Sequence, residues 1–398
     1  MESLRALYRI GRGPSSSHTM GPESACRVAA ARFPDADRYE VTLYGSLAKT
    51  GRGHGTDRVI ETTLAPLPVN VRFDSETADL PHPNTLDLVA YRGGREIGRL
   101  RVMSVGGGRI VCEGEERERA PRVYPEDTFF QIAELCKREG MALWEYVVAR
   151  EGEGVRDFAR RVWEQMKDTV ARGLRDEGVL PGGLNVQKKA KFLYEKKVAH
   201  ESKAAHENRL ICAYAFAVGE QNADAGVVVT APTCGSAGVL PASLLFEQQK
   251  HGQSDDEVIE ALLTAGLIGN LIKTNASISG AECGCQAEIG SACAMAAAGL
   301  GQLRRLDIDR IEYAAEIAVE HQLGLTCDPI CGLVQIPCIE RNAVAAMRAF
   351  NAVRLADILS DTRKISLDNV ILTMKNTGRD LGAAYRETAE GGLAKLEL

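Results

Sequence analysis

Cysteines are the residues of this 398-residue chain whose type and spacing most directly suggest chemistry. The chain has 11 of them, and six fall between Cys283 and Cys338, in the stretches GAECGCQAEIGSAC and CDPICGLVQIPC. In a reducing compartment such clustering favours metal ligation or catalysis over disulfide bridges. Buried thiols can also pack simply as small apolar groups, but packing explains any one of these cysteines better than all six.

The pattern of these cysteines bears on the kind of metal site. Structural zinc sites usually pair CxxC or HxxxH elements, and this chain lacks such a pair of pairs. Iron–sulfur clusters also take cysteine thiolates, and a cluster held by only three leaves one iron without a protein ligand. Such an open iron can act on a substrate oxygen as a Lewis acid, so three ligands indicate catalysis more readily than electron transfer. Pro329, Gly332 and Pro337 predict that the second stretch is a loop, which can direct its thiolates inward.

Two short motifs near the N-terminus contain other reactive groups. The sequence SSSHT, residues 15–19, follows Gly13 and Pro14 and precedes a helical stretch, so its hydroxyls could cap that helix. Hydroxyls and N–H groups at such a site could equally hold a carboxylate. His54 lies in the sequence TGRGHGTD, close to Arg52. It could be a loop histidine without a catalytic role, or it could be a catalytic residue. The residue pattern leaves both questions open.

The elements that must position these groups differ between the two parts of the chain. Period-two patterns predict strands at residues 39–45 and 69–73, and a hairpin from residue 97 to Cys112 with GGG at its turn. Residues 24–33 suit a helix on one face of that sheet. The charged, proline-containing stretch 114–125 is the candidate linker.

Beyond this linker the pattern becomes helical. We expect Asp127 to cap a helix whose apolar positions begin at Phe129, and a second helical stripe to run from Val155 to Met166. Residues 255–275 and 291–306 predict further helices with wide apolar faces. The predicted fold class is an α+β N-terminal domain, residues 1–120, followed by a larger, mostly all-α catalytic domain, residues 121–398.

Composition narrows the possible partners and location. The net charge of −6 gives no basic surface for nucleic acid or an anionic membrane, so we expect neither partner. The N-terminal sequence MESLRALYRIGRG does not resemble a signal peptide, which predicts a cytoplasmic location. Residues 225–246 lack charges, but Pro232 and Pro241 interrupt them, so we interpret this stretch as buried core.

Seven ordered blocks resemble the bacterial iron–sulfur L-serine dehydratases over nearly the whole chain. They are GPSSSHTMGP (13–22), YGSLAKTGRGHGTD (44–57), LPGGLNVQKKA (180–190), APTCGSAGVLPA (231–242), GCQAEIG (284–290), CDPICGLVQIPCIERNA (327–343), and TGRDL with YRETAEGGLA (377–394). The lysines that follow the third block (188, 189, 191, 196 and 197) either form a solvated helix face or help to hold an anion. In the fourth block Cys234 stands where the family commonly has asparagine.

The resemblance implies a set of site residues. The ligands of a [4Fe–4S] cluster would be Cys285, Cys327 and Cys338, whereas cysteines 283, 293 and 331 would only pack. Residues Ser15, Ser16, Ser17 and Thr19 would contact the substrate carboxylate. His18 would lie beside the bound amino acid, and His54 would also belong to the pocket. The remaining histidines receive no role, although His82 lies in an HPN sequence that the family shares.

The reaction implied is elimination of water from L-serine, giving pyruvate and ammonia without pyridoxal phosphate. An open iron would act as Lewis acid on the β-hydroxyl, and a histidine would remove the α-proton, with His18 the first choice and His54 the second. We expect the site in the cleft between the domains. The resemblance also suggests a homodimer.

Two other functions stay open, and the sequence differs from the family pattern at two places. Another β-substituted amino acid, such as threonine or cysteine, could be the substrate of the same kind of lyase. A non-catalytic metal-binding sensor is the alternative from another class. The chain is short between Asp57 and His82, which weakens the case for regulation by a second serine. It has no cysteine after Cys338, so we expect an open iron that no further cysteine covers.

Overall fold

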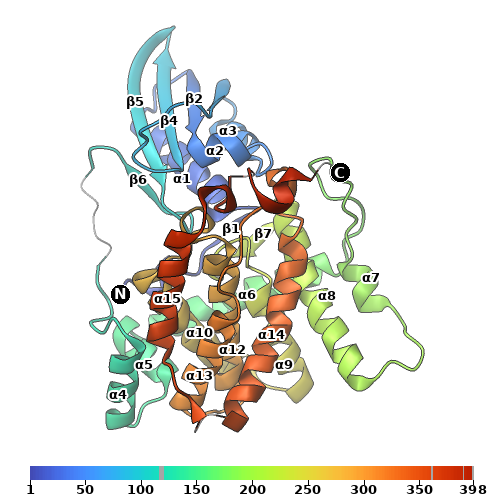
Figure 1. Cartoon of the computed structure of the whole chain (residues 1–398). Helices are drawn as coiled ribbons and strands as arrows, with labels where there is room; N and C mark the ends of the chain where they lie inside the picture. The colour runs from blue at the N-terminus through green and yellow to red at the C-terminus, as the bar shows by residue number, and fades with distance from the viewer. Residues whose placement is uncertain (116–120, 360–361, 389, 397–398) are drawn as a thin grey trace.

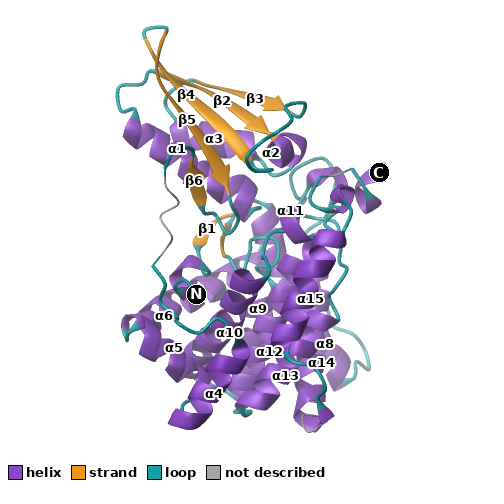
Figure 2. Cartoon of the chain, turned by 60° about the vertical axis from the view of Figure 1, so that its left-hand side comes forward, coloured by secondary structure: helices purple, strands orange, loops and turns teal. Residues whose placement is uncertain are grey.

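A computed structural model describes residues 1–115, 121–359, 362–388 and 390–396. Strands and short helices at one end adjoin a larger helical region, as Figures 1 and 2 show. This arrangement confirms the expected fold class, an α+β N-terminal region followed by a mostly helical one. The predicted boundary at 120/121 and the middle of the expected linker lie outside the described residues.

The N-terminal sheet has five strands in the order β3-β2-β4-β5-β6. Its strands are β2 Arg38–Tyr44, β3 Val69–Asp74, β4 Thr85–Arg92, β5 Arg95–Ser104 and β6 Ile110–Cys112. Only the β2–β3 pair is parallel among these, and the other neighbours are antiparallel. Helices α1 Gly21–Arg32, α2 Gly45–Thr50 and α3 Thr56–Leu64 cover one face of the sheet (Figures 1 and 2).

The predicted strands and hairpin are present, but the sequence patterns did not indicate β4. Its first four residues, from Thr85 to Leu88, are all buried because this strand lies between β2 and β5 near the helical region. A strand covered on both faces loses the alternation of buried and exposed positions that identifies a half-buried strand. The predicted helix at 24–33 begins slightly earlier, at Gly21.

The helical region is built around α12, Ser291–Leu303. Every residue of α12 from Ser291 to Gly301 is buried, and α12 packs against α9, α10, α13 and α14. Small side chains permit this close packing, since a Cβ atom at Gly299 would lie 3.3 Å from the carbonyl oxygen of Ala261. The other helices are α4 Phe129–Glu139, α5 Leu143–Glu151, α6 Gly154–Gly173, α7 Ala190–Glu195, α8 Lys203–Ala223, α9 Val239–His251, α10 Asp255–Asn275, α11 Gly280–Cys283, α13 Ile308–Glu320, α14 Cys338–Leu359 and α15 Leu367–Asp380.

Local expectations for this region are met except at one helix cap. The helix predicted at 255–275 coincides with α10, and the charge-free stretch 225–246 is mostly buried. The prediction that Asp127 caps α4 is wrong, because the Thr128 side chain accepts the hydrogen bond from the Gln131 N–H at 3.2 Å. The Asp127 carboxylate instead pairs with Arg122 at 2.6 Å. Among the described residues, no helix is long and apolar enough to cross a membrane.

The first twelve residues pack mainly against the helical region, although Glu2 also pairs with Arg109, between β5 and β6, at 2.7 Å. Leu4, Leu7 and Tyr8 are buried in the core of the helices, and the Tyr8 hydroxyl donates to the carbonyl of Leu262 at 2.8 Å. Strand β1, Ile10–Arg12, pairs antiparallel with β7, Val227–Val229. The chain then enters the SSSHT motif, so this anchored segment determines where the motif meets the helices.

We expect Leu7→Ala to lower the free energy of unfolding by about 2 to 4 kcal/mol, because a fully buried leucine would leave a cavity in the helical core. Denaturant titration followed by circular dichroism measures this change. As the control, Ile358→Ala should change stability by less than about 0.5 kcal/mol, since Ile358 is 79% exposed. Equal effects of the two substitutions would show that the N-terminal segment does not belong to the core.

Candidate active site

A pocket lies where loops of the N-terminal region meet the ends of the helices. Ser15 and His54 reach it from the N-terminal region, and Glu387 reaches it from the segment after α15. The remaining lining residues come from the helical region and its loops, apart from Pro14: Gly235, Cys285, Glu288, Ile289, Cys327, Asp328, Pro329, Val334, Pro337, Cys338 and Arg341. The site expected between the two parts of the chain therefore corresponds to a pocket lined by both.

Three of the six clustered cysteines line this pocket, and they are Cys285, Cys327 and Cys338. Cys285 precedes the π-helical turn that leads into α12, and Cys338 is the first residue of α14. Cys327 lies in a loop whose backbone is fixed from both sides, because its N–H donates to Tyr385 at 2.8 Å and its carbonyl accepts from Glu387 at 2.9 Å.

The other three clustered cysteines do not line the pocket. Cys283 packs so closely against α15 that a Cβ atom at Gly378 would lie 2.5 Å from its sulfur. The Cys293 thiol is buried inside α12 and donates to the carbonyl of Ala345 at 3.3 Å, and Cys331 is exposed. The positions of Cys283 and Cys293 suit the expected packing role, whereas the exposed Cys331 does not lie in a packed interior.

The pocket thiols differ in acidity. The hydrogen bond with Cys327, and after it the neighbouring Arg341, lower the pKa of Cys285 to about 6 against the opposing effect of burial, whereas the same hydrogen bond raises the pKa of Cys327. Burial raises the pKa of the Cys338 thiol. A thiolate at Cys285 is therefore stabilised beside the guanidinium, which is the form that binds metal.

The three sulfurs do not form a close chelate for a single ion. Within the described ranges, one trio of histidine, cysteine or acidic side chains has donor atoms all within 4.8 Å of one another, and it is His18, His54 and Glu387. The thiols share a pocket but fall outside that limit. A multi-iron cluster, whose ligands bind separate irons, suits this spacing better than one zinc ion.

The serine-rich motif caps a helix, as one of the two interpretations predicted. Ser15 precedes the π-helical turn Ser16–Met20, and its hydroxyl accepts from the His18 N–H at 3.1 Å. Thr19 Oγ1 accepts from the Ser15 N–H at 3.1 Å. Ser15, Ser16, Ser17 and Thr19 are all buried, but only Ser15 lines the pocket.

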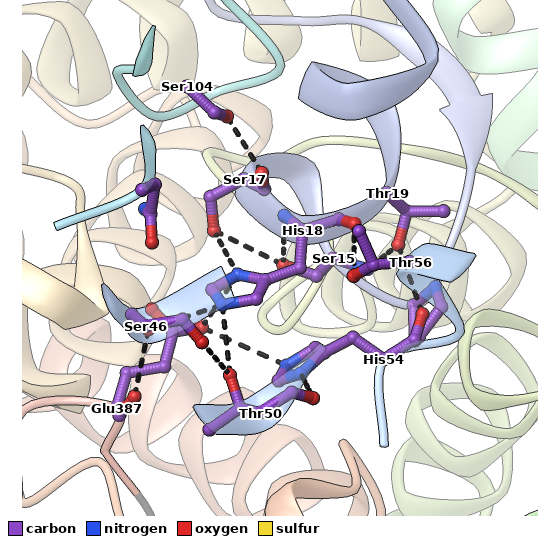
Figure 3. A network of polar contacts seen from close by, with 12 residues as sticks. Ser15, Ser17, His18, Thr19, Ser46, Thr50, His54, Thr56, Ser104 and Glu387 are labelled. Atoms are coloured by element: carbon purple, nitrogen blue, oxygen red, sulfur yellow. Dashed lines mark hydrogen bonds and ion pairs between the residues drawn. The ribbon is translucent and has the colours of Figure 1, made fainter. Parts of the chain in front are cut away.

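A hydrogen-bond network determines which nitrogen of His18 carries a proton (Figure 3). His18 Nε2 lies 2.9 Å from Thr50 Oγ1 and 3.2 Å from Ser46 Oγ. Both hydroxyls already donate to carbonyls, that of Thr50 to Ser46 and that of Ser46 to Glu387. In neutral His18, Nε2 must therefore be the donor, and Nδ1 accepts from the Ser17 hydroxyl at 2.9 Å.

His54 has the opposite tautomer. Its Nδ1 donates to the carbonyl of Thr50 at 2.8 Å, so the lone pair is on Nε2. The two imidazoles stack with centroids 4.4 Å apart. Burial lowers the pKa of His54 to about 4; burial, with the neighbouring His54, lowers that of His18. Both rings are neutral near pH 7.

Besides Asp328, sequence reasoning missed three charged residues that line the pocket, and they are Glu288, Arg341 and Glu387. The carboxylate of Glu387 lies 3.7 Å from His18 Nδ1 and 3.8 Å from His54 Nε2, and burial raises its pKa to about 7. Glu288 accepts from the Thr233 hydroxyl at 2.6 Å, and burial also raises its pKa. Among the residues that the structure describes, Arg341 is the only lysine or arginine that lines the pocket. All three lie within the blocks quoted for the resemblance, but no local pattern marks them.

Other sequence candidates lie away from the pocket lining. Lys188 pairs with Asp224 at 2.7 Å and Lys191 with Glu177 at 2.9 Å, which supports a structural role for the basic segment. The Arg52 guanidinium lies over the ring of Phe73. His82 Nδ1 accepts from the Asn84 N–H at 3.0 Å. Cys234 is buried beside Met20.

Comparisons with known proteins show the family of this chain. Residues 110–394 match the family model of the serine dehydratase alpha chain, and residues 3–67 match that of the beta chain. The L-serine dehydratase of Streptomyces coelicolor is 40% identical over 98% of both chains, and that of Haemophilus influenzae is 40% identical over 99% of both. L-serine dehydratase 1 of Escherichia coli is 38% identical over 99% of both chains. The chain therefore belongs to the serine dehydratase family, with beta-type and alpha-type regions in one polypeptide.

Proposed function

We propose that this chain is a lyase that converts L-serine into pyruvate and ammonia. The relatives that share nearly its whole length are L-serine dehydratases by name. The observation that carries the proposal is the meeting of three thiols, one guanidinium and one neutral histidine in a single buried pocket. The resemblance also favours a homodimer, which stays a proposal.

Cys285, Cys327 and Cys338 are the residues that would hold a [4Fe–4S] cluster. Their placement around one pocket and the stabilised thiolate of Cys285 fit such a ligand set. When bound, the cluster would supply a Lewis-acidic iron next to the leaving hydroxyl of serine. The neighbouring Arg341 would balance part of the negative charge of the thiolates.

The geometry favours His54 over His18 as the base, reversing the order that the sequence suggested. His54 lines the pocket, and its Nε2 lone pair is free of hydrogen bonds to hydroxyls. His18 does not line the pocket, and hydroxyls contact both of its ring nitrogens. We assign the α-proton to His54 Nε2, with His18 holding the stacked ring in position.

Arg341 and Ser15 are the groups we propose for the substrate carboxylate. Arg341 lines the pocket, and its Nη1 donates to the carbonyl of Thr326 at 2.8 Å while Nη2 lies 4.0 Å from Asp328, which fixes the guanidinium. The planar fork of arginine suits a carboxylate. Ser15 adds a hydroxyl at the opposite, N-terminal side of the lining.

The proposed elimination breaks the Cα–H and Cβ–O bonds of serine. The α-carbon loses its proton to His54 Nε2, the electron pair of the C–H bond forms the Cα–Cβ double bond, and the Cβ–O bond breaks. The departing hydroxide takes up one proton and leaves as water, and His54 returns to its neutral form by giving up the proton that it accepted. The product, 2-aminoacrylate, hydrolyses in water to pyruvate and ammonia. The same residues could also catalyse elimination from L-threonine or L-cysteine. Activity measurements on all three amino acids therefore have to identify the substrate.

Anaerobic purification followed by iron, sulfide and product analysis tests this function directly. We expect about four irons and four sulfides per chain and pyruvate release from L-serine, with lower rates on L-threonine and L-cysteine. Bound metal without turnover of any of the three amino acids would favour a sensor. Turnover of serine by protein that lacks iron and sulfide would refute the cluster.

We expect Cys327→Ser to lose the cluster and to lower kcat at least about 100-fold, because the substitution removes one of the three pocket sulfurs proposed to hold iron. Iron content, visible absorption and pyruvate formation measure the change. Cys331→Ser is the matched control, since it alters an exposed cysteine of the same loop and should keep both iron and activity. If the two variants behave alike, the ligand assignment is wrong.

His54→Ala should lower kcat for L-serine by about 10²- to 10⁴-fold, the usual effect of removing a general base, while the cluster stays bound. His18→Ala should have the smaller effect on kcat, because His18 does not face the pocket. Steady-state kinetics with iron analysis of both variants measure this. The reverse order of effects would return the base assignment to His18.

Stability should depend on pH through His54. Its pKa is about 4 in the folded protein against 6.5 ordinarily, so the unfolded chain binds the proton first. The resulting stability is present above pH 6.5 and is lost as pH falls towards 4, by about 3 kcal/mol. Denaturant titrations between pH 7 and 4 should therefore show a shallower loss for His54→Asn than for the unaltered protein. The control His206→Asn, which changes a surface histidine, should lose as much stability between pH 7 and 4 as the unaltered protein.

A further inference from the structure

Ligand atoms of His18, His54 and Glu387 all lie within 4.8 Å of one another. The tautomers place lone pairs on His18 Nδ1 and His54 Nε2, and both nitrogens lie within 3.8 Å of Glu387 Oε1. Figure 3 shows the three side chains converging. Within the part of the chain that the structure describes, the ion-pair contacts of the Glu387 carboxylate are those with these two imidazoles. A proton or a metal ion placed between the three acceptors would offset their mutual repulsion.

The surroundings of the histidines match those of metal ligands. A metal-bound histidine usually donates its other ring N–H to a carbonyl, a carboxylate or water, which fixes the tautomer. His54 donates in this way to the carbonyl of Thr50, and His18 donates to the hydroxyls of Thr50 and Ser46. The second shell of a metal site is therefore already in place.

The distances also favour a metal ion. Ligand atoms about 2.0 to 2.1 Å from a tetrahedral ion lie about 3.3 Å from one another. The two distances to Glu387 Oε1 are 3.7 and 3.8 Å, so each has to shorten by only about half an ångström. A protonated amine, with hydrogen bonds of about 2.9 Å, would require the same atoms to move apart.

We propose that His18 Nδ1, His54 Nε2 and Glu387 form a binding site for one divalent transition-metal ion, such as Zn²⁺, separate from the cysteine ligands. Two imidazoles and one carboxylate favour zinc or iron over magnesium or calcium, which prefer oxygen. The ion can enter through the pocket, which His54 and Glu387 line. The Ser17 hydroxyl, released from His18, has Ser15 Oγ at 3.3 Å as its alternative partner.

Binding of this ion would inhibit the enzyme. The metal occupies the lone pair of His54 Nε2, which the proposed elimination needs for the α-proton. This part rests on the proposed function, whereas the metal site itself does not. Inhibition should be reversible, because removal of the ion restores the lone pair and leaves the cysteine ligands unchanged.

Zinc titration of the cluster-containing protein tests the site. After incubation with ZnCl₂ and gel filtration, we expect one zinc per chain with iron and sulfide unchanged. X-ray absorption at the zinc edge should show nitrogen and oxygen at about 2.0 Å and no sulfur at about 2.3 Å. Serine turnover should fall at least tenfold and recover when a chelator removes the zinc.

Three variants provide the controls. Glu387→Gln and His54→Asn should each weaken zinc binding at least tenfold, whereas His206→Asn, which changes an exposed histidine beside Glu201, should not. Sulfur in the zinc shell, or full zinc retention in both site variants, would overturn the site. Zinc bound by the triad with turnover unchanged would overturn the inhibition. Absence of serine turnover without zinc would refute the proposed function, and the zinc measurements would still decide the site.

Discussion

The candidate site depends on a short chain of hydrogen bonds that ties three distant segments together. Ser46 donates to the carbonyl of Glu387, the Glu387 N–H donates to the carbonyl of Cys327, and the Cys327 N–H donates to Tyr385. These bonds connect the histidine-bearing region to the cysteine loop through the C-terminal segment. Because the bond between Ser46 and Glu387 is buried, breaking it would leave an unpaired polar group at a cost of about 1 to 3 kcal/mol. The relative position of thiols and histidines follows from these hydrogen bonds.

Burial then gives the side chains of this site their chemical character. Desolvation lowers the pKa of His54 and raises the pKa values of Glu288 and Glu387. The pocket therefore contains a neutral imidazole beside two carboxyl groups that ionise less readily than usual. Arg341 is the group that offsets their charge and that of Cys285. A site of this composition accepts a cation or a zwitterion more readily than a simple anion. The proposed substrate and the proposed metal ion both meet that condition.

Local patterns were reliable where one physical rule dominated. The apolar period of α10 predicted its full extent, and alternation predicted β2, β3 and the β5–β6 hairpin. The sequence patterns failed to predict β4 and the N-cap of α4, where the surrounding structure decides the outcome. Strand β4 is covered on both faces near the helices, and the cap of α4 is Thr128 because its backbone, rather than that of Asp127, has the extended conformation next to the first turn.

The sequence by itself determined the two-part architecture and, through the family resemblance, which cysteines belong together. Periodicity is a local property, and motif order is read directly along the chain. Only the tertiary structure decided which histidine faces the pocket and that Glu387, Glu288 and Arg341 join it. These assignments depend on contacts between residues more than 300 positions apart, such as Ser46 with Glu387, and on the burial that those contacts produce. Neither these contacts nor the burial can be recognised from residues that are neighbours in the sequence.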